Sequence, residues 1–61
     1  MKNIPTITII FFEEHNLYGF EYLDDNLNTQ VEYGHLTLDA CLGTAFRQLK
    51  TFVVLPDVET R

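Results

Sequence analysis

The first half of the chain has the hydrophobic pattern of β-strands. Residues 6–14 (TITIIFFEE) are rich in β-branched and aromatic side chains, which suit a pleated, packed surface. Pro5 precedes this run, at a position where a missing N–H group is tolerated. Residues 17–23 (LYGFEYL) predict a second strand. Residues 29–33 (TQVEY) alternate strictly and predict a half-buried third strand, which Gly34 ends.

A two-residue turn at His15 and Asn16 is expected to join the first two strands, because Asn tolerates positive φ. This turn would pair Phe11 with Phe20 and place Phe12 opposite Gly19. Successive side chains of a strand point to opposite faces. One face of the hairpin should then carry Ile7, Ile9, Phe11, Tyr18, Phe20 and Tyr22, and the other Thr8, Ile10, Phe12, Gly19, Glu21 and Leu23.

The second half of the chain contains one amphipathic helix, in residues 36–50 (LTLDACLGTAFRQLK). Thr37 is a good N-cap, Asp39 lies in the first turn, and Arg47 and Lys50 suit the negative end of the helix dipole. The apolar stripe consists of Leu38, Leu42, Ala45 and Leu49, flanked by Cys41 and Phe46. Gly43, in mid-helix, either marks a close backbone approach or is simply tolerated.

The last part of the chain predicts a short strand, residues 51–56 (TFVVLP), followed by a frayed tail, residues 57–61 (DVETR). The element order is therefore β-β-β-α-β, an α+β fold in a small single domain over residues 1–61. We expect an antiparallel three-stranded meander, a fourth strand beside the first, and the helix packed on one face. The expected strand order is third, second, first, fourth.

The short length of the chain limits its stability. A domain of 61 residues buries only about 60% of the surface that its unfolded chain exposes. Small domains compensate with disulfides, metals or oligomerisation. Cys41 is the only cysteine, so an internal disulfide cannot form. Oligomerisation, or docking onto a partner, is the compensation that remains.

Charge is distributed unevenly along this acidic chain, whose net charge is −5. The span from Asn3 to Phe46 contains no Lys or Arg, and the four bases are Lys2, Arg47, Lys50 and Arg61. A protein that grips phosphates needs clustered bases. We therefore expect no direct binding to nucleic acid.

The N-terminal run resembles a signal peptide only superficially. Lys2 precedes apolar residues, but Pro5 and the Glu13–Glu14 pair interrupt the pattern and no small-residue cleavage site follows. No segment reaches the roughly 20 apolar residues that a membrane span requires. We expect a soluble, cytoplasmic protein without membrane contact.

Two candidate sites for chemistry are weak. Cys41, with His35 and Asp39 nearby in the sequence, could form a nucleophile–base set, but a cysteine on the apolar side of a helix usually packs as a small hydrophobe. Glu13 and His15 share a strand face but provide too few ligands for a metal. The sequence contains no phosphate loop and no nucleophile elbow. We therefore predict no catalytic residues, no metal, no cofactor and no enzymatic activity.

The remaining signals are acids and aromatics at the predicted surface. They favour a small acidic protein-binding inhibitor, of the type that phages and mobile elements encode, that occludes a basic nucleic-acid-binding surface on a host protein. Such a protein would be of the anti-defence type, such as an anti-CRISPR or anti-restriction protein. The acidic candidates for partner binding are Glu13, Glu14, Glu21, Asp24, Asp25 and Glu32. The apolar and aromatic candidates are Ile10, Phe12, Tyr18, Tyr22 and Leu23.

Two alternatives remain open. The first is a homodimeric structural or regulatory subunit, or an antitoxin-like partner, with Ile10, Phe12 and Leu23 forming the seam between two copies. The second is that the acids only make the protein soluble. Either alternative agrees with the composition.

Overall fold

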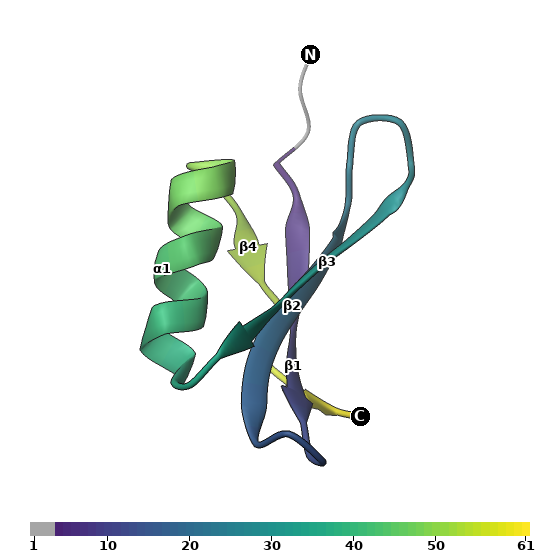
Figure 1. Cartoon of the computed structure of the whole chain (residues 1–61). Coiled ribbons are helices and arrows are strands. Elements are labelled where there is room, and N and C mark those ends of the chain that lie inside the picture. The colour runs from purple at the N-terminus through teal and green to yellow at the C-terminus, as the bar shows by residue number, and fades with distance from the viewer. Residues whose placement is uncertain (1–3) are drawn as a thin grey trace.

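An antiparallel meander of three strands forms most of the sheet (Figure 1). The computed structural model describes residues 4–61, so Lys2, counted above among the bases, lies outside the described residues. The elements are β1 (Thr6–Phe12), β2 (Leu17–Leu23), β3 (Thr29–His35), α1 (Leu38–Leu49), β4 (Val53–Val54) and β5 (Glu59–Thr60). The order β-β-β-α-β is confirmed. Helix α1 covers one face of the sheet.

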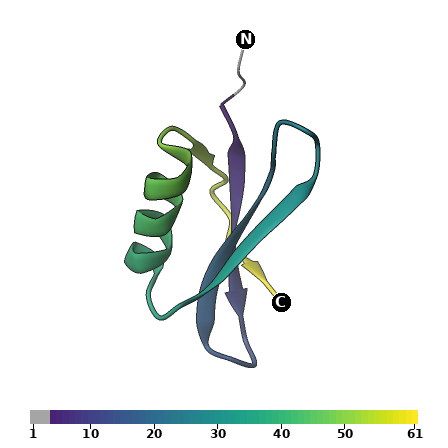
Figure 2. The ribbon, with the colours of Figure 1, turned by 45° about the horizontal axis from the view of Figure 1, so that its top comes forward.

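The central strand of the sheet is β1. The strand order is β3-β2-β1-β4, as expected, and β5 also pairs with β1. Both short strands are parallel to β1: β4 lies beside Thr6 and Ile7, and β5 beside Ile10 and Phe11. Figure 2 shows the yellow C-terminal segment beside β1. The predicted frayed tail is therefore wrong, because backbone pairing with β1 orders it.

The hairpin loop between β1 and β2 is longer than predicted. It has four residues, 13–16, and Ile9 pairs with Phe20 while Ile10 pairs with Gly19. The predicted partners are thus wrong, but the shift is two residues, so each side chain stays on its predicted face. Asn16 has the expected positive φ, of 55°. The His15 N–H donates to the Phe12 carbonyl at 3.2 Å and closes the turn.

The helix begins as its sequence predicts, but Leu38, expected in its apolar stripe, is 37% exposed and lies outside the core. The Ala40 N–H donates to Thr37 Oγ1 at 3.1 Å, which confirms the N-cap. The core between α1 and the sheet consists of Ile7, Ile9, Phe20, Cys41 and Ala45, with Tyr18, Tyr22, Leu42, Leu49 and Phe52 packed against it. Phe46, expected to flank the apolar stripe, is instead 64% exposed.

Strand β3 differs most from its prediction. The alternation predicted one buried face, yet Val31 and Tyr33 are 44% and 68% exposed. The reason is that α1 covers the opposite face, where Glu32 accepts a hydrogen bond from Gln48 Nε2 at 3.4 Å. The strand also continues through Gly34, whose φ of 102° accompanies a bulge in the β2–β3 pairing.

Candidate functional site

The sheet face opposite α1 is called the open face here, and its apolar residues are Phe12, Leu17, Leu23, Val31 and Tyr33. Figures 1 and 2 show that α1 lies on the other side of the sheet. Leu23 is 56% exposed, and Val31 and Tyr33 are also exposed. Large contiguous apolar patches on small soluble proteins commonly mark interaction sites. The open face is therefore the strongest candidate site in the described residues.

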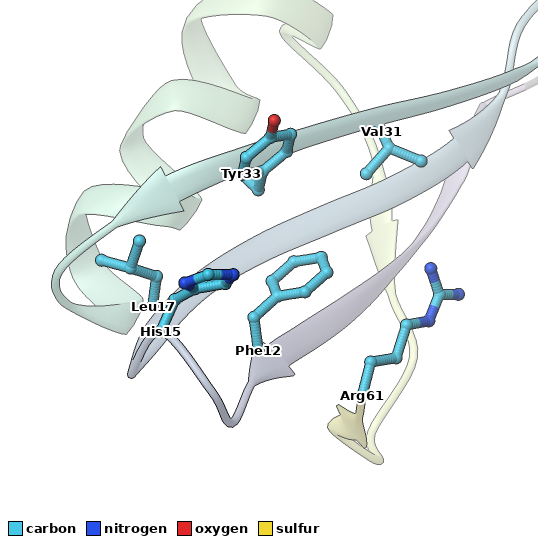
Figure 3. Close-up of a pocket in the computed structure, with 6 residues that line it drawn as sticks. All are labelled: Phe12, His15, Leu17, Val31, Tyr33 and Arg61. Atoms are coloured by element: carbon cyan, nitrogen blue, oxygen red, sulfur yellow. The ribbon is translucent and has the colours of Figure 1, made fainter.

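A hollow of about 530 Å³ lies on the open face and is called the aromatic cleft (Figure 3). It is lined by Phe12, His15, Leu17, Val31, Tyr33 and Arg61. The rings of Phe12 and Tyr33 are tilted by 54°, with centroids 5.7 Å apart, a favourable arrangement for two aromatics. Pockets of this volume accept a small ligand or several side chains of a partner.

The floor of the aromatic cleft depends on Gly19 of β2. A Cβ atom built on Gly19 would lie 3.0 Å from Cε2 of Phe12 and 2.9 Å from Cβ of Tyr33. Any side chain here would collide with the ring edge of Phe12 and with Cβ of Tyr33, so these neighbours would have to move. Gly19 thus lets Phe12 lie flat across the hairpin, although its direct partner in the register is Ile10.

Arg61 reaches the open face from β5. Its Nη2 donates to both carboxylate oxygens of Glu21 at 3.1 Å, and its Nε donates to Glu59. These hydrogen bonds, first to Glu59 and then to Glu21, raise the pKa of the Arg61 guanidinium. Its positive charge is therefore already matched by two carboxylates, and it is a poor anchor for another anion.

Ile10 lies on the open face but is fully buried, with a paired strand on each side. The register places Ile10 between Gly19 on β2 and Glu59 on β5. The Arg61 guanidinium bridges Glu59, which pairs with Ile10, and Glu21, which pairs with Thr8, so it spans β1. Ile10, expected on an uncovered strip, is 0% exposed and offers no surface to a partner. Of the predicted apolar strip, Phe12 and Leu23 remain.

The acidic candidates do not form one surface. Glu13 and Glu14 are exposed in the β1–β2 loop, and Asp25 is exposed in the turn at the other end of β2. Seven residues of β2 separate these two acidic ends, roughly 23 Å at the rise of a strand. This exceeds the Debye length of about 8 Å at physiological salt. The two ends therefore act on a partner independently.

Asp24 has a structural task in the β2–β3 turn. Its Oδ1 accepts the N–H groups of Asn26 and Asn28 at 2.9 Å, and its Oδ2 accepts Nε2 of Gln30 at 2.8 Å. The bonds from Asn28 and Gln30, in that order, lower the pKa of the Asp24 carboxyl. The Asp24 carboxylate therefore accepts hydrogen bonds within the chain and stabilises the turn.

Three predicted contact residues lie on the helix side of the sheet. Tyr18 and Tyr22 pack against the core, where Tyr18 contacts Phe11 with ring centroids 5.1 Å apart. Glu32 faces Gln48. Sequence reasoning missed Val31, Tyr33 and Leu17 as surface residues. The alternation in residues 29–33 places Val31 and Tyr33 on one face of the strand, but it does not indicate which face the helix covers.

The set of Cys41, His35 and Asp39, which the sequence already disfavours as a nucleophile site, gains no support from the structure. Cys41 is 0% exposed, and burial first, then the charge of Glu32, raises the pKa of its thiol. Both effects disfavour a nucleophilic thiolate. Asp39 is exposed, whereas His35 Nε2 is buried, 3.9 Å from Glu32 Oε1, with no hydrogen-bond partner in residues 4–61.

Other kinds of site find little support in the part of the chain that is described. No group of three His, Cys, Asp or Glu side chains there could hold a metal ion. No helix there is long and apolar enough to cross a membrane. No protein family, curated protein or solved structure matches the chain.

Proposed function

We propose that this chain is a protein-binding inhibitor without catalytic chemistry, and that it binds its partner through the open face. The observation that carries the proposal is the aromatic cleft between Phe12 and Tyr33, on a face that α1 leaves uncovered. Aromatic side chains in such a position provide the large contact area that dominates binding energy in many interfaces.

A protein partner fits the aromatic cleft better than a small metabolite does. Sites for small molecules usually combine an apolar wall with several polar groups that converge on the ligand. Here the lining residues with polar side-chain groups are His15, Tyr33 and Arg61, and the Arg61 guanidinium is already bonded to Glu21 and Glu59. An apolar anchor of a partner, such as an aliphatic or aromatic side chain, needs fewer polar contacts.

The partner we propose has a basic surface, such as the nucleic-acid-binding groove of a host defence protein. Exposed Glu13 and Glu14 at one end of the sheet and Asp25 at the other would attract such a surface to both ends of the open face. Occupation of the groove would then exclude nucleic acid sterically. We place this activity in the cytoplasm, where a free thiol such as that of Cys41 stays reduced.

The test begins with capture of partners from the native host, followed by calorimetry with each purified partner. Tyr33→Ala should weaken binding about tenfold or more, because it removes half of the aromatic cleft. Phe46→Ala is the matched control, since Phe46 is similarly exposed but lies on α1. Equal losses for the two variants, or none for Tyr33→Ala, would refute binding through the open face.

A salt series tests the electrostatic part separately. Glu13→Gln combined with Glu14→Gln should slow association with a basic partner and flatten its salt dependence, while dissociation changes little. Asp25→Asn, in the turn at the other end of β2, should likewise slow association and flatten its salt dependence. Asp24 is unsuitable for this test because its oxygens hold the turn. Association that is independent of salt would contradict the proposed basic partner.

A further inference from the structure

We propose that two copies of this chain associate through β3, whose free edge pairs antiparallel with β3 of the second copy. The two edges of the sheet differ. One edge is made of the two-residue strands β4 and β5, separated by a segment that contains Pro56. The other is β3, which has seven residues and no Pro or Lys to block an added strand. In the described part of the chain, β3 has a strand on one side only.

The alternation of hydrogen-bonded and non-hydrogen-bonded pairs between β2 and β3 shows which backbone groups of β3 face outward. The Asp24 N–H donates to the Asn28 carbonyl at 2.9 Å, so this pair begins the β2–β3 ladder. Hydrogen-bonded and non-hydrogen-bonded pairs alternate along an antiparallel ladder. The N–H and C=O groups of Gln30 and Glu32 therefore point to β2. Those of Thr29, Val31 and Tyr33 point away from it.

The close approach of Gly19 to Tyr33 supports this assignment of hydrogen-bonded and non-hydrogen-bonded pairs. Gly19 pairs with Tyr33, and a Cβ atom on Gly19 would come within 2.9 Å of the Tyr33 Cβ. Side chains come closest in the non-hydrogen-bonded pairs of an antiparallel ladder. Tyr33 thus occupies such a pair, and its backbone groups are free for an outer strand.

One register of a β3–β3 pairing fits the side chains best. With Val31 on the twofold axis, Gln30 lies opposite Glu32 of the second copy, and Thr29 lies opposite Tyr33 of the second copy. An amide faces a carboxylate, and no like charges meet. Two other registers keep the same side chains on the same face. With Glu32 on the twofold axis, Glu32 lies opposite Glu32 of the second copy, and the pairing extends into the bulge at Gly34. With Gln30 on the twofold axis, only residues 29–31 of the two strands overlap.

This pairing joins the two open faces side by side. A twofold axis perpendicular to the sheet keeps each face on its own side, so Val31 and Tyr33 of both copies meet in one apolar strip. The exposed areas of these two side chains, 44% and 68% in the single chain, would then decrease. Such burial supplies the compensation that a domain of this size needs. This association does not depend on the proposed inhibition.

The first experiment uses the unmodified chain. Sedimentation velocity should show a monomer–dimer equilibrium between about 1 µM and 1 mM. Each copy carries a charge of −5, so added salt should strengthen dimerisation. Binding to a basic partner should weaken with salt, and the two proposals can therefore fail separately. A monomer throughout this range would overturn the dimer.

Hydrogen exchange by NMR locates the interface. The amides of Thr29, Val31 and Tyr33 should gain protection as the concentration rises, whereas those of Gln30 and Glu32, already bonded to β2, should not. A dimer that leaves the three outward amides unchanged would assemble elsewhere and would also overturn the proposal. The proposal would also be overturned if this edge paired with a strand of a different protein while the chain did not associate with itself.

Substitutions test the register. Val31→Lys places two ammonium groups at the twofold axis and should weaken dimerisation at least about tenfold. Leu23→Lys is the control: the same change on the open face, but on β2, should leave dimerisation within about twofold. Gln30→Lys should tighten the dimer several-fold, because the lysine faces Glu32 of the second copy. Circular dichroism checks that each variant is folded. Equal effects of Val31→Lys and Leu23→Lys would refute edge pairing.

Discussion

The ring of Phe12 on β1 lies across Gly19 on β2, so near that a Cβ atom on Gly19 would be 3.0 Å from Phe12 Cε2. On its other sides the same Cβ would meet Tyr33 and the carbonyl oxygen of Glu32, which belongs to the backbone and cannot move cheaply. The aromatic cleft and the β2–β3 ladder therefore share one requirement, the absence of a side chain at this position.

We expect Gly19→Ala to lower the free energy of unfolding by about 2 kcal/mol, because it overpacks a well-packed site. Urea denaturation followed by circular dichroism measures this loss. Gly43→Ala is the control, since its Cβ would meet only Arg47 Nη1, at 3.7 Å. It should raise stability by up to about 1 kcal/mol through helix propensity. Equal stability of Gly19→Ala and the wild type would show that the strand contact is looser than described.

The Asp24 carboxylate should make stability depend on pH. Its pKa is lower in the folded chain than the ordinary value of 3.8. A group with a lowered folded pKa stabilises fully above its unfolded pKa and loses this effect as the pH falls through the folded pKa. Urea unfolding between about pH 6 and pH 2 should therefore show a loss of stability below pH 3.8 that is smaller in Asp24→Asn.

The control for this experiment is Asp25→Asn, in the same turn. Asp25 is exposed, and its substitution should leave the acid limb of the stability curve close to that of the wild type. If Asp24→Asn retained the full acid dependence, the turn would not be held by the ionised carboxylate.

Arg61 should hold β5 against β1. The Arg61 N–H donates to the Phe11 carbonyl and its own carbonyl accepts the Glu13 N–H, both at 2.9 Å. Arg61→Ala removes the bonds to Glu21 and Glu59 and should speed hydrogen exchange of the Glu13 amide. Glu21→Gln should act in the same direction, and high salt should reduce the difference. Glu14→Gln, in the exposed loop, serves as the control. Unchanged exchange in Arg61→Ala would mean that backbone pairing alone holds β5.

Cys41 should be unreactive in the folded chain. It is fully buried, and its raised pKa reduces the thiolate fraction near neutral pH. Labelling with iodoacetamide should be about 100-fold slower, or more, than in the chain unfolded in urea, because the reagent waits for an opening of the core. Similar rates in both states would show that α1 detaches readily from the sheet and would reopen the question of a reactive thiol.

Sequence patterns predicted the faces of the hairpin better than its pairing. The predicted two-residue turn and the observed four-residue loop differ by an even shift, and an even shift keeps every residue on its face. Ile9 and Phe20 therefore reached the core as expected, with different cross-strand neighbours. The helix was predictable because Thr37 caps it and its apolar residues recur with the helical period.

The rest of the fold depends on long-range contacts that local patterns do not encode. The sequence DVETR has little strand propensity, and β5 exists because β1 offers it a free edge. Ile10 is buried where it pairs with Gly19 on β2 and with Glu59 on β5, and β5 is distant in the sequence. Likewise, the alternation in β3 cannot specify which face α1 covers. The candidate site was thus predicted in Phe12 and Leu23 but not in Val31 and Tyr33.

The central place of β1 has a consequence for the order of folding. The meander that β1 forms with β2 and β3 needs only near neighbours in the sequence. The other edge of β1 pairs with residues 53–60, which are distant in the sequence. A folding intermediate that contains only the meander would therefore present two bare edges, and pairings between distant segments form slowly. Protein concentration during refolding should then influence how much of the chain escapes aggregation.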